Sequence, residues 1–183
     1  MTKPMAVNAR PRSGASPQSR VRARTRTCRL ALFAMALAAG AAQAGDCTIS
    51  TSGLSFGTYD PLVVSPVDAN GSVQVNCSPG LGEILFGVNV TISLGTGGSG
   101  TYASRTMQLS TTSTLSYNLY TTAARTTVWG NGTGGTQTVG GAVGGLLSGQ
   151  PSPRSFPVYG RIPGNQDAAA GLHGDTVIVT VTF

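Results

Sequence analysis

The fold class of this chain is decided by its last nine residues, Asp175-Thr176-Val177-Ile178-Val179-Thr180-Val181-Thr182-Phe183. They are rich in valine, isoleucine and threonine, which favour β-strands. Strand alternation places Val177, Val179, Val181 and Phe183 on one face. A strand this apolar should be paired on both sides and covered by a second layer. No later strand follows it, so an earlier strand or a second molecule is expected to complete the pairing.

The first 44 residues have the composition of a secretory signal peptide. Eight of the 12 basic residues precede residue 30, and an apolar run then extends from Leu30 to Ala42. This run has the length of a signal core and is too short to cross a bilayer as a helix. Ala42-Gln43-Ala44 matches a small-x-small cleavage site. We expect cleavage after Ala44, which would leave residues 45–183 as one exported domain with no integral membrane segment.

Removal of this signal peptide reverses the net charge. The whole chain carries +6, but residues 45–183 contain four arginines, no lysine and six carboxylates, which gives −2. The basic character therefore belongs to the signal peptide, and nucleic-acid binding is not expected. A single histidine and six scattered carboxylates also offer little for catalysis. The composition predicts a non-catalytic protein without a metal site or a cofactor.

Three charged or titratable residues could still suggest a site. His173 lies two residues from Asp175, but no Gly-x-Ser-x-Gly nucleophile elbow occurs in the chain, so we expect a solvated loop histidine. Arg105 and Arg125 are expected to be solvated or to pair with carboxylates for little energy.

Cys47 and Cys77 are the two cysteines of the exported region, since Cys28 lies in the signal peptide. An even number of cysteines in an exported domain predicts a disulfide. The alternation from Ser72 to Cys77 turns Val73 and Cys77 inward, as an inter-strand disulfide requires. The bridge would close a loop of about thirty residues and contribute roughly 3–4 kcal/mol.

The exported region contains about eight short apolar segments separated by glycine-rich turns, which predicts an all-β sandwich. Asn70-Gly71 predicts a turn. The two prolines of segment 156–163 predict an edge strand or a bulge. The expected strands are 48–56, 72–77, 84–94, 107–109, 115–120, 126–129, 156–163 and 175–183.

A series of short motifs resembles the spore coat protein U domain, found in subunits of archaic chaperone–usher pili. The resemblance covers nearly the whole exported region and rests on the order of the motifs and on the terminal phenylalanine. The motifs are Phe56-Gly57-x-Tyr59-Asp60-Pro61, Gly71-Ser72-Val73-x-Val75-x-Cys77, Arg105-Thr106-Met107, Leu115-x-Tyr117-Asn118-Leu119-Tyr120, Ala124-Arg125-Thr126, Trp129-Gly130-x-Gly132-Thr133-Gly134-Gly135-Thr136, Phe156-Pro157-Val158-Tyr159-Gly160-Arg161-Ile162 and Gly174-Asp175-Thr176-Val177.

This resemblance implies an immunoglobulin-like sandwich that lacks one strand and is completed by a partner. In the family, a periplasmic chaperone lends a strand during export, and the N-terminal extension of another subunit replaces it at the outer-membrane usher. The expected partners are therefore a chaperone, an usher and other pilus subunits. The expected acceptor groove is lined by Val177, Val179, Val181 and Phe183. The expected location is the periplasm in transit, then the cell surface or the medium, with a role in adhesion or biofilm formation.

One departure from the family pattern concerns the N-terminus. Shaft subunits carry about a dozen alternating apolar residues before the first cysteine, whereas cleavage after Ala44 leaves only Gly45-Asp46 before Cys47. The protein is thus expected to accept a strand without giving one, at a tip or terminal position. The alternative is a free-standing secreted coat or carbohydrate-binding protein with a self-complete sandwich.

Trp129 and the glycine-rich loop that follows it permit two interpretations. An exposed tryptophan could form a surface that binds sugars or abiotic material. The other interpretation, which we favour, is a core tryptophan beside a tight turn.

Overall fold

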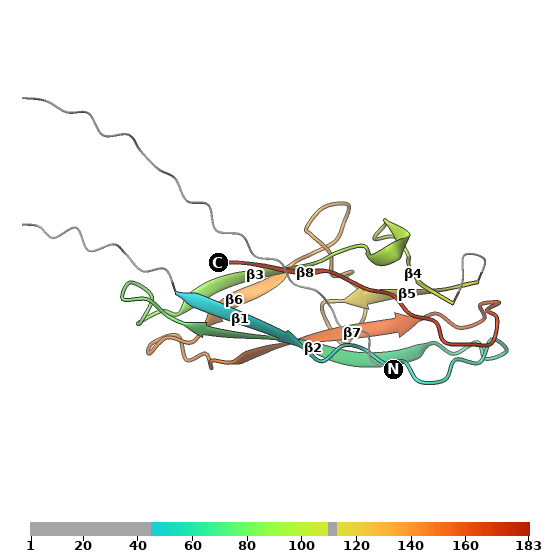
Figure 1. Ribbon diagram of the computed structural model, residues 1–183, viewed down its shortest axis with the longest axis horizontal. Coiled ribbons are helices and arrows are strands. Elements are labelled where there is room, and N and C mark those ends of the chain that lie inside the picture. Colours follow the sequence, from blue (N-terminus) through green and yellow to red (C-terminus); the bar gives the residue numbers. More distant parts are fainter. Residues whose placement is uncertain (1–44, 110–112) are drawn as a thin grey trace, which may run out of the picture.

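Eight strands form two sheets in the computed structural model, which describes residues 45–109 and 113–183 (Figure 1). The all-β sandwich predicted from the sequence is confirmed, while the predicted signal peptide lies outside the described residues. The strands are β1 (Asp46–Thr51), β2 (Val67–Ser78), β3 (Val88–Leu94), β4 (Arg105–Gln108), β5 (Thr114–Tyr120), β6 (Val139–Val143), β7 (Arg154–Ile162) and β8 (Val179–Thr182), with one short 3-10 helix, η1 (Gly97–Ser99).

The two sheets pack face to face and all their ladders are antiparallel. The larger sheet has the order β1-β2-β7-β5-β4, and the smaller one has the order β6-β3-β8. Alternate residues of each strand fill the core between the layers, as strand geometry requires. Across residues 45–109 and 113–183, no helix has the length and apolar character needed to span a membrane.

The C-terminal strand follows the predicted alternation over most of its length. Val177, Val179 and Val181 are 4%, 0% and 6% exposed, whereas Ile178 is 55% exposed. Phe183 differs from the prediction, because it lies beyond the end of β8 and is 56% exposed. Within the described residues, β8 pairs with β3 alone and therefore forms an edge of the smaller sheet.

The predicted disulfide is present in the structure. Cys47 and Cys77 occupy directly opposed positions of β1 and β2 and are bonded to each other. Because β1 is the edge strand of the larger sheet and pairs only with β2, the bridge fastens this edge covalently to its single neighbour.

The turn predicted at Asn70-Gly71 is wrong, because both residues lie inside β2 and pair with β7. Here the glycine provides a close approach and not a turn. A Cβ added at Gly71 would overlap the carbonyl oxygen of Gly53 and lie 2.7 Å from Leu54 Cδ1. The segment after β1 therefore crosses β2 at a distance that only glycine allows.

Replacing Gly71 with alanine is expected to destabilise the fold by about 1–3 kcal/mol, because backbone atoms that cannot yield would meet the new methyl group. The matched control is Gly82→Ala, since a Cβ at Gly82 has open space around it. The control should change the free energy of unfolding by less than about 0.5 kcal/mol. Urea unfolding measures both, and equal effects would contradict the close-approach argument.

The strand predicted at 84–94 begins later than expected. Gly87, with φ of +77°, ends a turn, and β3 starts at Val88. The carbonyl groups of Ile84 and Leu85 instead accept hydrogen bonds from the backbone N–H groups of Leu146 and Leu147. Together these turns expose six large apolar side chains at one end of the sandwich. They are Leu81, Ile84, Leu85, Phe86, Leu146 and Leu147.

The edge position predicted for segment 156–163 is also wrong, because β7 lies between β2 and β5. The prolines are compatible with this interior position because β5 pairs only with residues 159–161 of β7. Pro157 precedes that stretch and pairs with β2 on one side only. A proline without a backbone N–H is tolerated there, since no second neighbour needs the donor.

Candidate functional site

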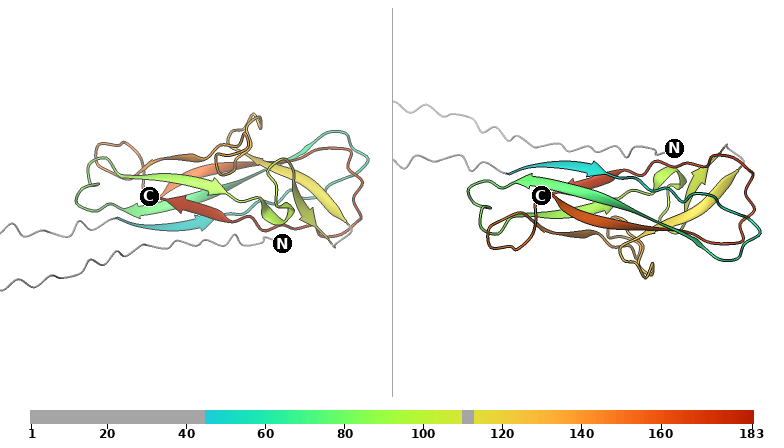
Figure 2. Two further views of the ribbon diagram at one scale, coloured as in Figure 1. Left: turned by 90° about the horizontal axis from the view of Figure 1, so that it is seen from above. Right: turned by 90° about the horizontal axis from the view of Figure 1, so that it is seen from below.

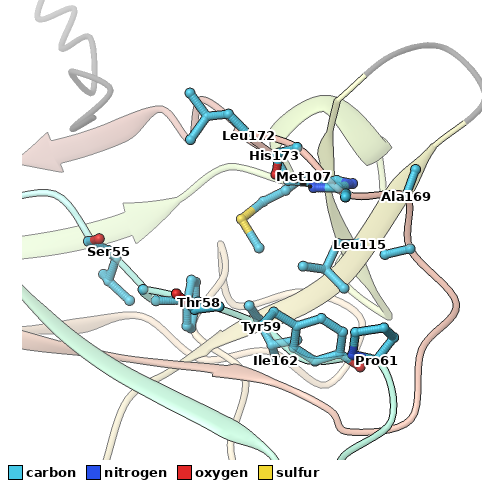
Figure 3. Close-up of a pocket in the computed structure, with 16 residues that line it drawn as sticks. Ser55, Thr58, Tyr59, Pro61, Met107, Leu115, Ile162, Ala169, Leu172 and His173 are labelled. Carbon is cyan, nitrogen blue, oxygen red and sulfur yellow. Dashed lines mark hydrogen bonds between the residues drawn. The ribbon is translucent and has the colours of Figure 1, made fainter.

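A groove of about 460 Å³, lined by both apolar and polar side chains, opens beside the larger sheet. One wall is formed by residues 54–61, and the other by residues 168–173. Figure 3 shows Met107 and Leu115 between these two walls. The floor of the groove is therefore formed by the half-buried Met107 and by the edge of the buried core at Leu115.

A smaller cavity of about 90 Å³ continues the groove toward β8. The two cavities share Leu54, Phe56, Met107 and His173. The smaller one ends at Val177, two residues before β8. The two cavities together thus extend from the segment after β1 to the segment that leads into β8.

The groove lies between segments that follow one edge strand and precede the other. Within the described residues, β1 and β8 each pair on one side only, and they lie along the same flank of the sandwich (Figure 2). Residues 53–59 and 168–173 belong to no ladder. Edge strands leave one row of backbone groups unpaired, although the cavities are lined by the connecting segments and not by β1 or β8 themselves.

The second wall is fastened to β5 by side-chain hydrogen bonds. The Gln166 side chain accepts from the Ser116 backbone N–H (2.8 Å) and donates to the Ser116 carbonyl (2.9 Å). The Gln166 backbone N–H donates to Tyr59 Oη across the end of the groove at 2.7 Å. Ala169 N–H donates to Ser113 Oγ at 3.2 Å. These bonds hold an otherwise irregular segment in one position.

A buried tyrosine fixes the point at which the second wall turns toward β8. Tyr117 is 5% exposed, and its hydroxyl donates to Asp175 Oδ2 at 2.7 Å. Burial, and then the hydrogen bond to Asp175, raises the pKa of Tyr117 far above its ordinary value. Asp175 Oδ1 accepts from the backbone N–H groups of Gly98 (2.9 Å) and Thr176 (2.7 Å). Asp175 therefore joins β5, η1 and the start of the C-terminal segment.

Arg105 lies in the core, which corrects the expectation that it is solvated. It is 0% exposed, and burial lowers the pKa of its guanidinium. The guanidinium donates to Gly95 O at 2.8 and 3.0 Å, to Asn118 Oδ1 at 2.6 Å and to Trp129 O at 2.7 Å. Arg105 thus connects the loop after β3, strand β5 and the segment at Trp129, through two buried acceptors and one partly buried acceptor.

Trp129 is also fully buried, which rules out a role for its side chain as a surface-binding group. Its indole N–H donates to the Ile92 carbonyl at 3.0 Å. The glycine-rich loop after it places Gly130 against Thr136, where a Cβ would lie 2.7 Å from Thr136 Cβ. The tryptophan fills the core beside a tight loop, which is the interpretation that the sequence favoured.

His173 is half-buried in the groove wall and is not the solvated residue expected from the sequence. Its Nε2 lies 3.3 Å from Ser113 Oγ, and its Nδ1 lies 3.4 Å from the Gly171 carbonyl. The Asp175 carboxylate is engaged by Tyr117 and by backbone N–H groups, and not by the histidine. The three side chains therefore do not form a serine–histidine–aspartate relay.

The residues predicted to line an acceptor groove are distributed over three environments. Val177 lines the smaller cavity. Val179 and Val181 are buried in the core under β8, and Phe183 is exposed beyond it. The sequence did not single out Leu54, Phe56, Met107 or Leu115 as groove residues. The only signal for two of them was the alternation of Leu54 and Phe56 just after β1.

Comparison with known protein families establishes the family of this chain. The model of the Spore Coat Protein U domain matches residues 32–180. The chain belongs to the Spore Coat Protein U domain family. Protein U of Myxococcus xanthus is 34% identical over 153 residues, which cover 76% of this chain and 78% of that protein. The family predicted from the motifs is confirmed.

Among solved structures, the chain is similar to one in the crystal structure of the CsuC–CsuE chaperone–tip adhesion subunit pre-assembly complex, from archaic chaperone–usher Csu pili of Acinetobacter baumannii. The TM-score is 0.48 at 22% sequence identity. The match covers 76% of this chain and 40% of that chain.

Proposed function

We propose that this Spore Coat Protein U domain protein is a non-catalytic subunit of a cell-surface pilus assembled by the chaperone–usher route. In this role it accepts a β-strand from a periplasmic chaperone and then from another subunit. The predicted signal peptide would deliver it to the periplasm, and the usher would then export it. The proposal rests on the family resemblance and on one structural observation, the groove.

The observation that carries the proposal is the groove between the segment that follows β1 and the segment that precedes β8. Strand addition takes its affinity from main-chain pairing at a sheet edge, and its register from pockets for alternate side chains. Here β8 has one unpaired edge within the described residues. The larger cavity, of about 460 Å³, has an apolar floor that includes Met107, Leu115 and Ile162. We infer a terminal position in the fibre, because the predicted cleavage leaves two residues before Cys47.

A second function is favoured by a different observation. Val177, Val179 and Val181 are at most 6% exposed, so the chain already covers the inner face of its C-terminal strand. A sandwich that buries its own edge valines could be stable alone. The alternative is therefore a free-standing coat or carbohydrate-binding protein. The description of the family as a spore coat domain agrees with this alternative.

The two functions are distinguished by a strand-binding experiment on the purified exported protein. The probe is a peptide from the N-terminal extension of a shaft subunit of the same bacterium. A one-to-one complex and an increased midpoint of thermal unfolding are expected, because a ligand that binds only the folded state stabilises it. Ala169→Trp should weaken binding at least tenfold, because the indole would occupy the groove that Ala169 lines.

The matched control is Leu147→Trp, at an exposed position in a different loop. This variant should bind the peptide as the unchanged protein does. A monomer that is stable alone, with an unfolding midpoint that the peptide does not alter, would support the free-standing alternative. Equal binding by the Ala169→Trp and Leu147→Trp variants would place the acceptor site outside the groove.

A further inference from the structure

The carboxylate of Glu83 accepts a hydrogen bond from Gly45, the residue that precedes β1. Gly45 N–H donates to Glu83 Oε2 at 3.2 Å, and Gly80 N–H donates to the same oxygen at 3.3 Å. Glu83 belongs to the turn between β2 and β3, where its own N–H donates to Gly80 O and its carbonyl accepts from Gly87 N. The carboxylate is therefore held by a tight turn and directed at the start of β1.

No cationic side chain within residues 45–109 and 113–183 forms an ion pair with Glu83. The ion pairs of this part of the chain both involve Asp68, with Arg125 and with Arg161. Residues 45–183 contain no lysine. Glu83 is half-buried, and the two backbone N–H groups of Gly45 and Gly80 are hydrogen-bond donors to its carboxylate.

The surroundings of Gly45 accommodate glycine and no larger residue. A Cβ at this position would lie 2.7 Å from Glu83 Oε2, 2.7 Å from Ser78 O and 3.2 Å from Val88 Cγ2. The backbone nitrogen therefore reaches the carboxylate because the residue has no side chain. Asp46, which follows, is exposed and pairs with Ser78 in the β1–β2 ladder.

We propose that Glu83 is a binding site for the α-ammonium group that forms at Gly45 when the chain is cleaved after Ala44. Cleavage would convert a neutral peptide N–H into a cation at the atom that already contacts the carboxylate. The charge made by processing would thus supply the partner that the described side chains do not provide. The folded state of the processed protein would gain an ion pair that the precursor does not have. This inference rests on the predicted cleavage site and is independent of the proposed pilus function.

The absence of lysine makes the test simple, because the α-amine is the single amine of the processed chain. The protein is isolated from the periplasm, and mass spectrometry should show Gly45 as its first residue. Reaction of the folded protein with an acetylating ester at neutral pH then modifies this amine alone. We expect Glu83→Gln to be acetylated about tenfold faster than the unchanged protein, because the ion pair keeps the amine protonated and unreactive.

The control is Asp46→Asn, which removes an exposed carboxylate next to the amine without touching the contact. This variant should react at the rate of the unchanged protein. In a second measurement, acetylation should increase the unfolding constant of the unchanged protein about tenfold but leave that of Glu83→Gln unaltered. Equal acetylation rates in the unchanged and Glu83→Gln proteins, or a first residue other than Gly45, would overturn the proposal.

Discussion

Replacing Arg105 with leucine is expected to lower the free energy of unfolding by about 3–5 kcal/mol, the cost of breaking a buried charged contact. The reason is the group of acceptors that the guanidinium serves. Trp129 O and Asn118 Oδ1 would each lose a charged donor within the core, and the partly buried Gly95 O would lose one as well. A buried acceptor without a partner keeps the full cost of leaving water. Leucine could fill part of the volume, but it cannot donate.

Urea unfolding, followed by the fluorescence of Trp129, measures this effect, because Trp129 is the single tryptophan of the chain. The matched control is Arg161→Leu. Arg161 pairs with Asp68 through bonds of 2.7 and 2.9 Å, with both side chains about one third exposed. The control should cost less than about 1 kcal/mol. A similar cost for both variants would contradict the assignment of Arg105 as a structural centre.

Replacing both Cys47 and Cys77 with alanine is expected to lower the free energy of unfolding by about 2–5 kcal/mol. The bridge joins residues 30 apart in the sequence and so restricts the unfolded chain. Cys77 is also 4% exposed and packs in the core, so its sulfur contributes contacts. The midpoint of urea unfolding of a protein comprising residues 45–183, with and without a reductant, provides the measurement.

Two observations check that this effect comes from the bridge. The oxidised protein should have a mass two hydrogens below that of the dithiol form. A reductant should lower the unfolding midpoint of the unchanged protein and leave the double variant unaffected. A double variant with the midpoint of the oxidised protein would show that the bridge does not limit stability.

The strands that could be predicted from the sequence are those in which one face is buried and the other is solvated. In β2, Val73, Val75 and Cys77 alternate with exposed residues, and the alternation alone predicted their burial. In β5, alternation likewise predicted the burial of Leu115, Tyr117 and Leu119, but Asn118 on the opposite face is also buried. For these strands the period of two in hydrophobicity corresponds directly to burial.

The features that could not be predicted depend on contacts between residues distant in sequence. The turn preference of an Asn-Gly pair is a local property. It does not reveal that Gly71 lies inside a strand, where the segment at Gly53 and Leu54 crosses over it. The burial of Arg105 likewise depends on loop carbonyls near residues 95 and 129, which the fold brings together. No short window of sequence contains that information.

The candidate groove could be predicted only in part. The apolar C-terminal strand indicated which part of the chain would adjoin the groove, and Val177 does line the smaller cavity. The walls, however, are irregular segments at 54–61 and 168–173. Irregular segments carry no hydrophobic period, so their meeting is fixed by side chains such as Gln166 and by long-range packing. These contacts are visible only in the folded molecule.

The disulfide between β1 and β2 also makes the two ends of the domain mechanically unequal. A force applied at the N-terminus is transmitted from β1 to β2 through the Cys47–Cys77 disulfide. Nine residue pairs then join β2 to β7 and resist that force. A pull on the C-terminus enters β8, which four residue pairs join to β3. Under tension, β8 would therefore separate first. The N-terminal strand is therefore held covalently, whereas the C-terminal strand is held by backbone pairing and side-chain packing alone.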